Sequence, residues 1–109
     1  MIRLVRRDEV RSRIDAGRAI LVEALPPEYF RKAHLPGALN LPMDEVETLA
    51  PRLLPNRAAE IVVYCANSGC RNSATVARRL SGMGYTNILD YDEGKDDWMD
   101  AGLPTESGD

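Results

Sequence analysis

The chain has 109 residues, 44% of them hydrophobic, which is the usual size of a single domain with its own core. Its 14 basic and 17 acidic residues give a formal net charge of -3 and are spread along the chain, which argues against a nucleic-acid-binding or polybasic membrane-binding surface. No apolar run reaches the roughly 20 residues that span a bilayer and no secretory signal is apparent, so we expect one soluble, cytoplasmic domain over residues 1–109, without nucleic-acid or membrane partners.

The first part of the chain alternates strand-like and helix-like segments. Residues 2–4 predict a short edge strand, and residues 6–16 predict a helix that stops at Gly17. Residues 19–22 are a continuous apolar run, typical of a strand buried on both faces. Two prolines end that strand, and residues 28–33 predict a helical turn.

The middle of the chain repeats this alternation. Residues 38–41 predict another short strand after a Pro-Gly turn. Asp44 is predicted to cap the next helix, with Glu47 in a capping box, and Pro55 stops that helix. Residues 61–64 combine three β-branched side chains with a tyrosine, which places this strand at the centre of the sheet.

The last part of the chain supplies one more helix and one more strand. Residues 73–80 predict a helix with one apolar stripe, and residues 87–91 predict the final strand. Trp98 is expected to lie on the core within a last helical segment, and residues 105–109 are expected to be a frayed tail. The whole pattern predicts an α/β domain with a mostly parallel sheet.

The loop after the central strand carries the most reactive side chains of the chain, with Cys65 at its start and Cys70 and Arg71 at its end. In open parallel sheets, ligands bind beyond the carboxyl ends of the strands, next to the N-termini of the following helices. The helix dipole, the loop N–H groups and Arg71 are expected to lower the pKa of Cys65 from about 8.5 to roughly 3.5–7.5. The alternative is that Cys65 ends its strand as a small apolar residue.

An ordered set of short segments covers nearly the whole chain: Leu21-Val22-Glu23, residues 34–42, Val62-Val63-Tyr64-Cys65, the helix from Ser73, residues 84–88, Glu93-Gly94 with Trp98, and residues 101–104. In this order the segments resemble a rhodanese-like domain, a family that transfers sulfur through a cysteine persulfide. The resemblance implies a central five-stranded sheet flanked by helices on both faces, with the reactive cysteine at Cys65. It implies a structural place for His34, the only histidine, and no cofactor. Two cysteines and one histidine are also too few for a structural zinc site, so no metal site is predicted.

Two departures from the family pattern lie outside the loop. The family's Asp-Val-Arg triplet is replaced by Glu23, Ala24 and Leu25, so its arginine is missing. Where the family has a Gly-Gly pair followed by an apolar residue, this chain has Glu93-Gly94 followed by Lys95. The Lys95 ammonium either faces an anion in the loop or reaches solvent.

The loop is also longer than usual. The common sulfurtransferase pattern is a cysteine, four residues, an arginine and a serine, whereas Arg71 stands six positions and Ser73 eight positions after Cys65. If Ser73 is aligned with the family serine, Asn72 takes the place of the arginine. The spacing from Cys65 to Arg71 resembles instead the loop of rhodanese-related phosphatases and arsenate reductases. A phosphatase also needs a general acid, for which the nearby carboxylates are Asp92, Glu93, Asp96 and Asp97.

These residues predict a sulfurtransferase that holds sulfane sulfur as a persulfide on Cys65. Its partners would be a small anionic donor such as thiosulfate, or a persulfidated protein, and a thiol acceptor. Arg71 would bind the donor, and Cys70 would be a resolving thiol, unless it packs inward without a chemical role. The predicted anion-binding loop consists of Ala66, Asn67, Ser68, Gly69 and Asn72. The alternatives are a non-catalytic binding or regulatory module and a phosphatase or arsenate reductase.

Overall fold

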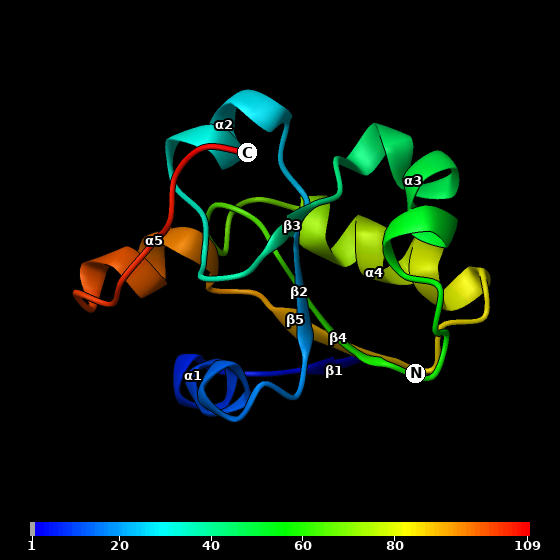
Figure 1. Ribbon diagram of the computed structural model, residues 1–109, viewed down its shortest axis with the longest axis horizontal. Helices are drawn as coiled ribbons and strands as arrows, with labels where there is room; N and C mark the ends of the chain where they lie inside the picture. Colours follow the sequence, from blue (N-terminus) through cyan, green and yellow to red (C-terminus); the bar gives the residue numbers. More distant parts are fainter. Residues whose placement is uncertain (1) are drawn as a thin grey trace.

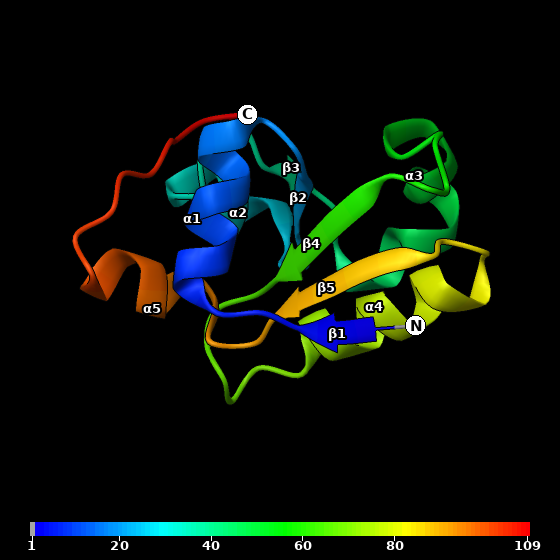
Figure 2. The same ribbon diagram turned by 90° about the horizontal axis from the view of Figure 1, so that it is seen from below.

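Five strands pair side by side in a computed structural model that describes residues 2–109. The strands are β1 (Ile2–Leu4), β2 (Ile20–Glu23), β3 (Leu39–Asn40), β4 (Glu60–Tyr64) and β5 (Asn87–Tyr91). They are ordered β1-β5-β4-β2-β3 and every neighbouring pair is parallel, as the arrows of β1, β4 and β5 show in Figure 2. The predicted five-stranded sheet is confirmed, with β4 at its centre and β1 and β3 at its edges.

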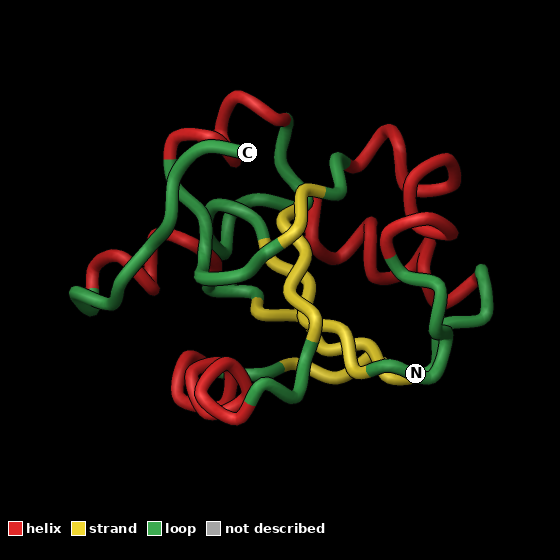
Figure 3. The backbone as a smooth tube through the Cα atoms, in the orientation of Figure 1, coloured by secondary structure: helices red, strands yellow, loops and turns green. Residues whose placement is uncertain are grey.

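Five helices cover the two faces of this sheet. They are α1 (Arg7–Ala16), α2 (Pro27–Lys32), α3 (Val46–Leu53), α4 (Asn72–Gly82) and α5 (Gly94–Asp100). Figure 1 shows α1, α2 and α5 on one side of the strands and α3 and α4 on the other, and the strands lie between these groups in Figure 3. Each side encloses its own apolar cluster. Within the described residues, no helix combines the length and the apolar character that crossing a membrane requires.

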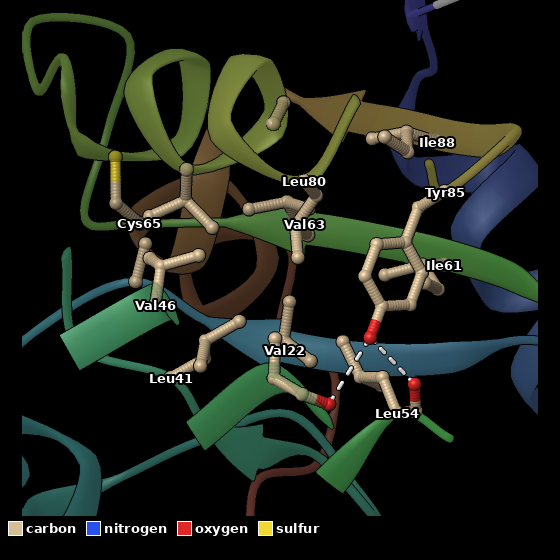
Figure 4. Packing of buried hydrophobic residues seen from close by; sticks show 14 of the residues in the cluster. Val22, Leu41, Val46, Leu54, Ile61, Val63, Cys65, Leu80, Tyr85 and Ile88 are labelled. Atoms are coloured by element: carbon tan, nitrogen blue, oxygen red, sulfur yellow. Dashed lines mark hydrogen bonds between the residues drawn. The ribbon is translucent and has the colours of Figure 1, made fainter. Parts of the chain in front are cut away.

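The central strand β4 is buried on both faces. Ile61 and Val63 pack against the α3 and α4 side, whereas Val62 and Tyr64 pack against the α1 and α5 side. All four side chains are 0% exposed, and burying one such side chain contributes roughly 1.5–3 kcal/mol. Figure 4 shows that Cys65 continues the row of Ile61 and Val63. In the same view, the Tyr85 hydroxyl lies 2.6 Å from the carbonyl oxygen of Leu54 and 3.1 Å from that of Ala50, which ties the end of α3 to the start of β5.

The predicted start of the third helix is wrong. Asp44 lies inside a 3₁₀ turn over Met43–Glu45, and α3 begins at Val46 without a side-chain cap. The backbone closes this turn itself, because the N–H of Glu45 donates to the carbonyl oxygen of Pro42 at 3.0 Å.

The expected frayed tail is also wrong. The tail pairs with the chain around His34, where the N–H of each of His34 and Glu106 donates to the other's carbonyl oxygen at 2.9 and 2.8 Å. The N–H of Gly108 donates to Arg31 O at 2.8 Å, which docks the tail on α2. His34 stacks on Phe30, with ring centroids 3.8 Å apart, and is buried as a structural residue.

A buried ion pair joins three elements near the carboxyl edge of the sheet. The Lys95 ammonium donates to Glu23 Oε2 at 3.0 Å, and to the carbonyl oxygens of Tyr29 at 3.1 Å and Ala33 at 2.7 Å. Lys95 is 6% exposed and Glu23 is 0% exposed. Lys95 therefore neither reaches solvent nor faces the loop, because its side chain is buried against Glu23 and the end of α2. It links α5, β2 and the end of α2.

The turn between β5 and α5 lies directly against the start of the loop. Gly94 has φ +72°, and a Cβ added there would lie 2.6 Å from the carbonyl oxygen of Cys65. The next two N–H groups, of Lys95 and Asp96, donate at 2.8 Å to the carbonyl oxygens of Cys65 and Ala66. This close backbone contact fixes the direction in which the chain leaves β4, and only glycine allows it.

We expect Gly94→Ala to destabilise the domain more than Gly102→Ala. Gly102 has φ +75° and open space at its Cβ position, so alanine there meets only the left-handed backbone penalty of about 1–2 kcal/mol. Gly94→Ala adds overpacking against the backbone of Cys65, worth a further ~1–3 kcal/mol. Urea unfolding of both variants measures the difference, and equal losses would show that the contact at Gly94 is unimportant.

Lys95→Met should lower the free energy of unfolding by about 3–5 kcal/mol at neutral pH, because it leaves Glu23 buried and unpaired. Burial raises the pKa of Glu23 and Lys95 opposes that rise, so the folded variant must protonate this carboxyl. Its stability should therefore be greatest below about pH 4.3 and fall as the pH rises. The matched control is the double variant Glu23→Leu with Lys95→Met, which should be close to the parent in urea unfolding. A single variant as stable as the parent at pH 7 would contradict the role of the pair.

Candidate functional site

Cys65 follows the last residue of β4 and starts the loop that leads to α4. Its side chain is 0% exposed, and its Sγ lies 3.4 Å from the carbonyl oxygen of Cys70, to which the thiol donates. In Figure 4 the sulfur points away from the apolar row of the sheet, toward the loop. The loop therefore folds back over the thiol that begins it.

The expectation of an acidic thiol is wrong for this conformation. Burial raises the pKa of Cys65 to about 11, and a hydrogen bond with the Cys70 side chain contributes to the rise. The N–H and the hydroxyl of Ser73 lower the pKa, but they do not outweigh burial. Arg71 lies at the surface. The prediction from sequence counted the groups that stabilise a thiolate, but it did not take into account how far burial would raise the pKa of Cys65.

Asn67 holds the loop in its closed shape. Its carbonyl oxygen accepts the N–H of Cys70 at 3.0 Å, and its side-chain oxygen accepts the N–H of Gly69 at 3.0 Å. Its amide nitrogen donates to Asp96 Oδ2 at 3.0 Å, which ties the loop to α5. Two of the expected anion-binding N–H groups are thus used within the loop. Asn67, Ser68 and Gly69 are exposed at its tip.

The end of the loop is attached to β2 and α4. The Asn72 amide donates to the carbonyl oxygen of Ala24 at 2.9 Å, so Asn72 joins the loop to the chain after β2. Arg71 is the residue before the helix, and its side chain makes no hydrogen bond or ion pair with the described residues. Leu25, at the position of the missing family arginine, lies in the apolar cluster. The guanidinium of Arg71 is therefore free to meet an external anion.

Two further polar residues belong to this site, and the sequence analysis assigned a chemical role to neither. Ser73 is 1% exposed in the first turn of α4, and Asp90 is 4% exposed on β5. Ser73 acts on the pKa of Cys65, as described above, and its hydroxyl also lowers the pKa of Asp90. A signal was available, because a period of two along β5 places Asp90 on the same inward face as Ile88.

The carboxylates considered for a general acid lie in the segment after β5. Asp96 contacts the loop through Asn67, but Asp97 accepts hydrogen bonds from Tyr91 at 2.6 Å and from Arg7 at 2.8 Å. Asp97 is therefore engaged with α1 and β5 rather than with the loop.

The family model for the rhodanese-like domain matches residues 6–101. The HTH-type transcriptional regulator Rv0324 of Mycobacterium tuberculosis is 32% identical over 104 residues, which cover 95% of this chain and 45% of that protein. The thiosulfate sulfurtransferase PspE of Escherichia coli is 34% identical over 67 residues, 62% of each chain.

Solved structures agree with the sequence comparisons. The human single domain sulfurtransferase TSTD1 superposes with a TM-score of 0.80 at 25% identity, over 89% of this chain and 95% of that chain. This chain spans 62% or less of the length of each of the curated relatives named here. Because the family model matches most of the chain and its fold agrees, the chain belongs to the family of rhodanese-like domains.

Proposed function

We propose that this domain is a sulfurtransferase that carries sulfane sulfur as a persulfide on Cys65. The position of Cys65 carries the proposal, because the thiol lies at the carboxyl end of the central strand, where ligands reach a parallel sheet. Relatives that bear the names thiosulfate sulfurtransferase and single domain sulfurtransferase support this reading.

The reaction has two halves. The Cys65 thiolate forms a bond with the outer sulfur of a donor such as thiosulfate, and sulfite leaves with the electron pair of the broken S–S bond. An acceptor thiolate then takes the outer sulfur, and the electron pair of that second S–S bond returns to Cys65. Arg71, exposed and unpaired within the described residues, would attract the anionic donor, and N–H groups of residues 66–72 would stabilise it once the loop opens.

The loop must open for this reaction, because Cys65 is fully buried in the closed form. Its tip is exposed and is linked to α5 by the surface hydrogen bond from Asn67 to Asp96, whereas the backbone hydrogen bonds from α5 hold only the start of the loop, at Cys65 and Ala66. Opening would bring solvent and donor to the sulfur, and the loss of burial would lower the pKa of the thiol. Donor binding and thiol activation are then one event.

We propose Cys70 as the resolving thiol. It is half-buried, its carbonyl oxygen accepts from Cys65, and its side chain contributes to the raised pKa of Cys65. Attack of Cys70 on the inner sulfur of the persulfide would release hydrogen sulfide and leave a disulfide between the two cysteines. In the cytoplasm, the location that we also propose, glutathione or thioredoxin would supply the two electrons and two protons that return this disulfide to two thiols.

A non-catalytic binding or regulatory module is the second candidate. The buried, protonated Cys65 and the apolar Leu25 at the family arginine's position favour it. The relative named as an HTH-type transcriptional regulator matches this chain over 45% of its own length, which is compatible with a regulatory use.

Intact-mass measurement after incubation with thiosulfate decides between these candidates. Cys70→Ser should gain the mass of one sulfur atom, which dithiothreitol removes, whereas Cys65→Ser should gain none, since only Cys65 is the first nucleophile. In the parent, attack by Cys70 should convert this gain into the loss of two hydrogen atoms as the disulfide forms. Equal loading of Cys65→Ser would sink the assignment of the site. A Cys70→Ser variant that loads no sulfur from thiosulfate or from polysulfide would favour the binding module.

Mild peroxide treatment tests the resolving thiol separately. The parent should lose the mass of two hydrogen atoms as a Cys65 sulfenic acid condenses with Cys70, and Cys70→Ser should instead accumulate sulfenic or sulfinic acid. A parent that accumulates only these oxygen adducts would show that Cys70 does not resolve Cys65.

A further inference from the structure

Two buried polar atoms beside Cys65 lack hydrogen-bond partners. They are Ser73 Oγ and Asp90 Oδ1, each inaccessible to solvent and without a hydrogen-bond partner among the described residues. One oxygen of Glu23 shares this condition, but its other oxygen binds Lys95. Buried polar groups are nearly always satisfied, so an unpartnered hydroxyl and an unpartnered carboxylate oxygen near the same thiol indicate a role other than stability.

The sheet register places these groups in line with the thiol. Asp90 on β5 pairs with Val63 on β4, and Cys65 is the next inward-facing residue after Val63. Strands lie about 4.8 Å apart and two residues span about 6.6 Å along a strand, so the diagonal from Asp90 to Cys65 is roughly 8 Å. This diagonal is too long for a direct hydrogen bond, but one intervening hydroxyl can bridge it.

Ser73 supplies that hydroxyl. It is in the first turn of α4, the helix that packs on this face of β4 and β5. Its N–H and hydroxyl lower the pKa of Cys65, and the same hydroxyl lowers the pKa of Asp90. The Ser73 side chain therefore lies near both the thiol and the carboxylate, although its oxygen makes no hydrogen bond to either in the closed loop.

We propose that Ser73 and Asp90 form a proton relay for Cys65, in which Asp90 stores the thiol proton while Cys65 carries sulfur. This inference rests on the proposed sulfurtransferase function. The relay supplies a proton acceptor inside the protein, because the buried thiol has no contact with water until the loop opens.

The thiol proton leaves Cys65 in the first half-reaction and returns to it in the second. As the Cys65 sulfur forms its bond to the donor sulfur, its proton passes to Ser73 Oγ and the serine proton passes to Asp90 Oδ1, while sulfite leaves. When the acceptor thiolate takes the outer sulfur, the electron pair returns to Cys65. Asp90 then gives its proton to Ser73, which passes its own proton to Cys65. Asp90 is a base in the first half and an acid in the second.

The surroundings of Asp90 suit both roles. Burial raises its pKa, the Ser73 hydroxyl lowers it, and the charge of Asp92 raises it. Leu4 on β1 and Val63 on β4 are its paired neighbours, so the adjoining strands contribute no charge at these positions. A carboxyl with a raised pKa takes a proton more readily near neutral pH than an exposed one.

The test uses the Cys70→Ser background, in which Cys65 is the only thiol. Single-turnover sulfur loading from thiosulfate is followed by intact mass between about pH 5 and pH 9. In this parent the rate should level off once Asp90 is ionised. Asp90→Asn cannot accept a proton, so its rate should rise tenfold per pH unit with the thiolate fraction, and at about pH 6 it should be roughly 100-fold slower than the parent.

Further variants distinguish a proton relay from a structural role of Asp90. Ser73→Ala should reproduce the profile of Asp90→Asn, and the double variant should be no slower than either single variant, because both break one chain. Asp92→Asn should lower the pKa of Asp90 and move the levelling point to lower pH. Asp100→Asn, at an exposed site at the end of α5, is the matched charge control and should behave as the parent.

Each outcome decides the proposal. A faster Asp90→Asn would mean that the carboxylate only repels the thiolate, and an equal slowing at every pH would mean a structural role; either overturns the relay. If Asp90→Asn fails to fold, as checked by circular dichroism, Ser73→Ala carries the test.

Alkylation by iodoacetamide over the same pH range separates the relay from the proposed function, because it needs thiol deprotonation but no sulfur chemistry. A parent that loads no sulfur but whose alkylation shows the same pH profiles would remove the sulfurtransferase function and keep the relay. Sulfur loading with identical profiles in parent and Asp90→Asn would do the reverse. A parent thiol that reacts with neither reagent would overturn both.

Discussion

The burial of β4 on both faces is the constraint on which the rest of the molecule depends. Its four inward side chains anchor two apolar clusters, and its position between β2 and β5 brings Cys65 to the carboxyl edge of the sheet. The same burial that positions the thiol also keeps it protonated, because a thiolate is poorly solvated there. The burial that positions Cys65 therefore also lowers its reactivity. To form a thiolate, Cys65 requires opening of the loop or a base inside the protein.

Two buried acids near the site meet this low-dielectric environment in different ways. Glu23 is neutralised by the ammonium of Lys95, which also holds the end of α2 and the start of α5. Asp90 has no ion-pair partner among the described residues, and the nearby Ser73 hydroxyl only lowers its raised pKa. The first arrangement is suited to holding elements together, since both charges are paired. The second leaves a carboxyl free to change its protonation state.

Local patterns predicted most of the elements, and long-range contacts explain the failures. Residues 87–91 form β5 as predicted, because apolar alternation between turn signals is decided within the segment itself. The partner of Lys95 is 72 residues away in sequence, so no local pattern could name it. The docking of residues 106–108 on the chain at and after α2 could not be predicted for the same reason. The pKa of Cys65 was misjudged because helix-end effects can be read from sequence, whereas the depth of burial depends on how the loop folds.

The two edge strands of the sheet are short, which limits pairing of the sheet with strands of other proteins. β1 has three residues and β3 has two, so neither offers the long row of unpaired N–H and C=O groups that recruits a foreign strand. The chain matches only part of the length of the two curated relatives named above. A sheet that cannot be extended at either margin can be placed beside other folded units with little risk of aggregation.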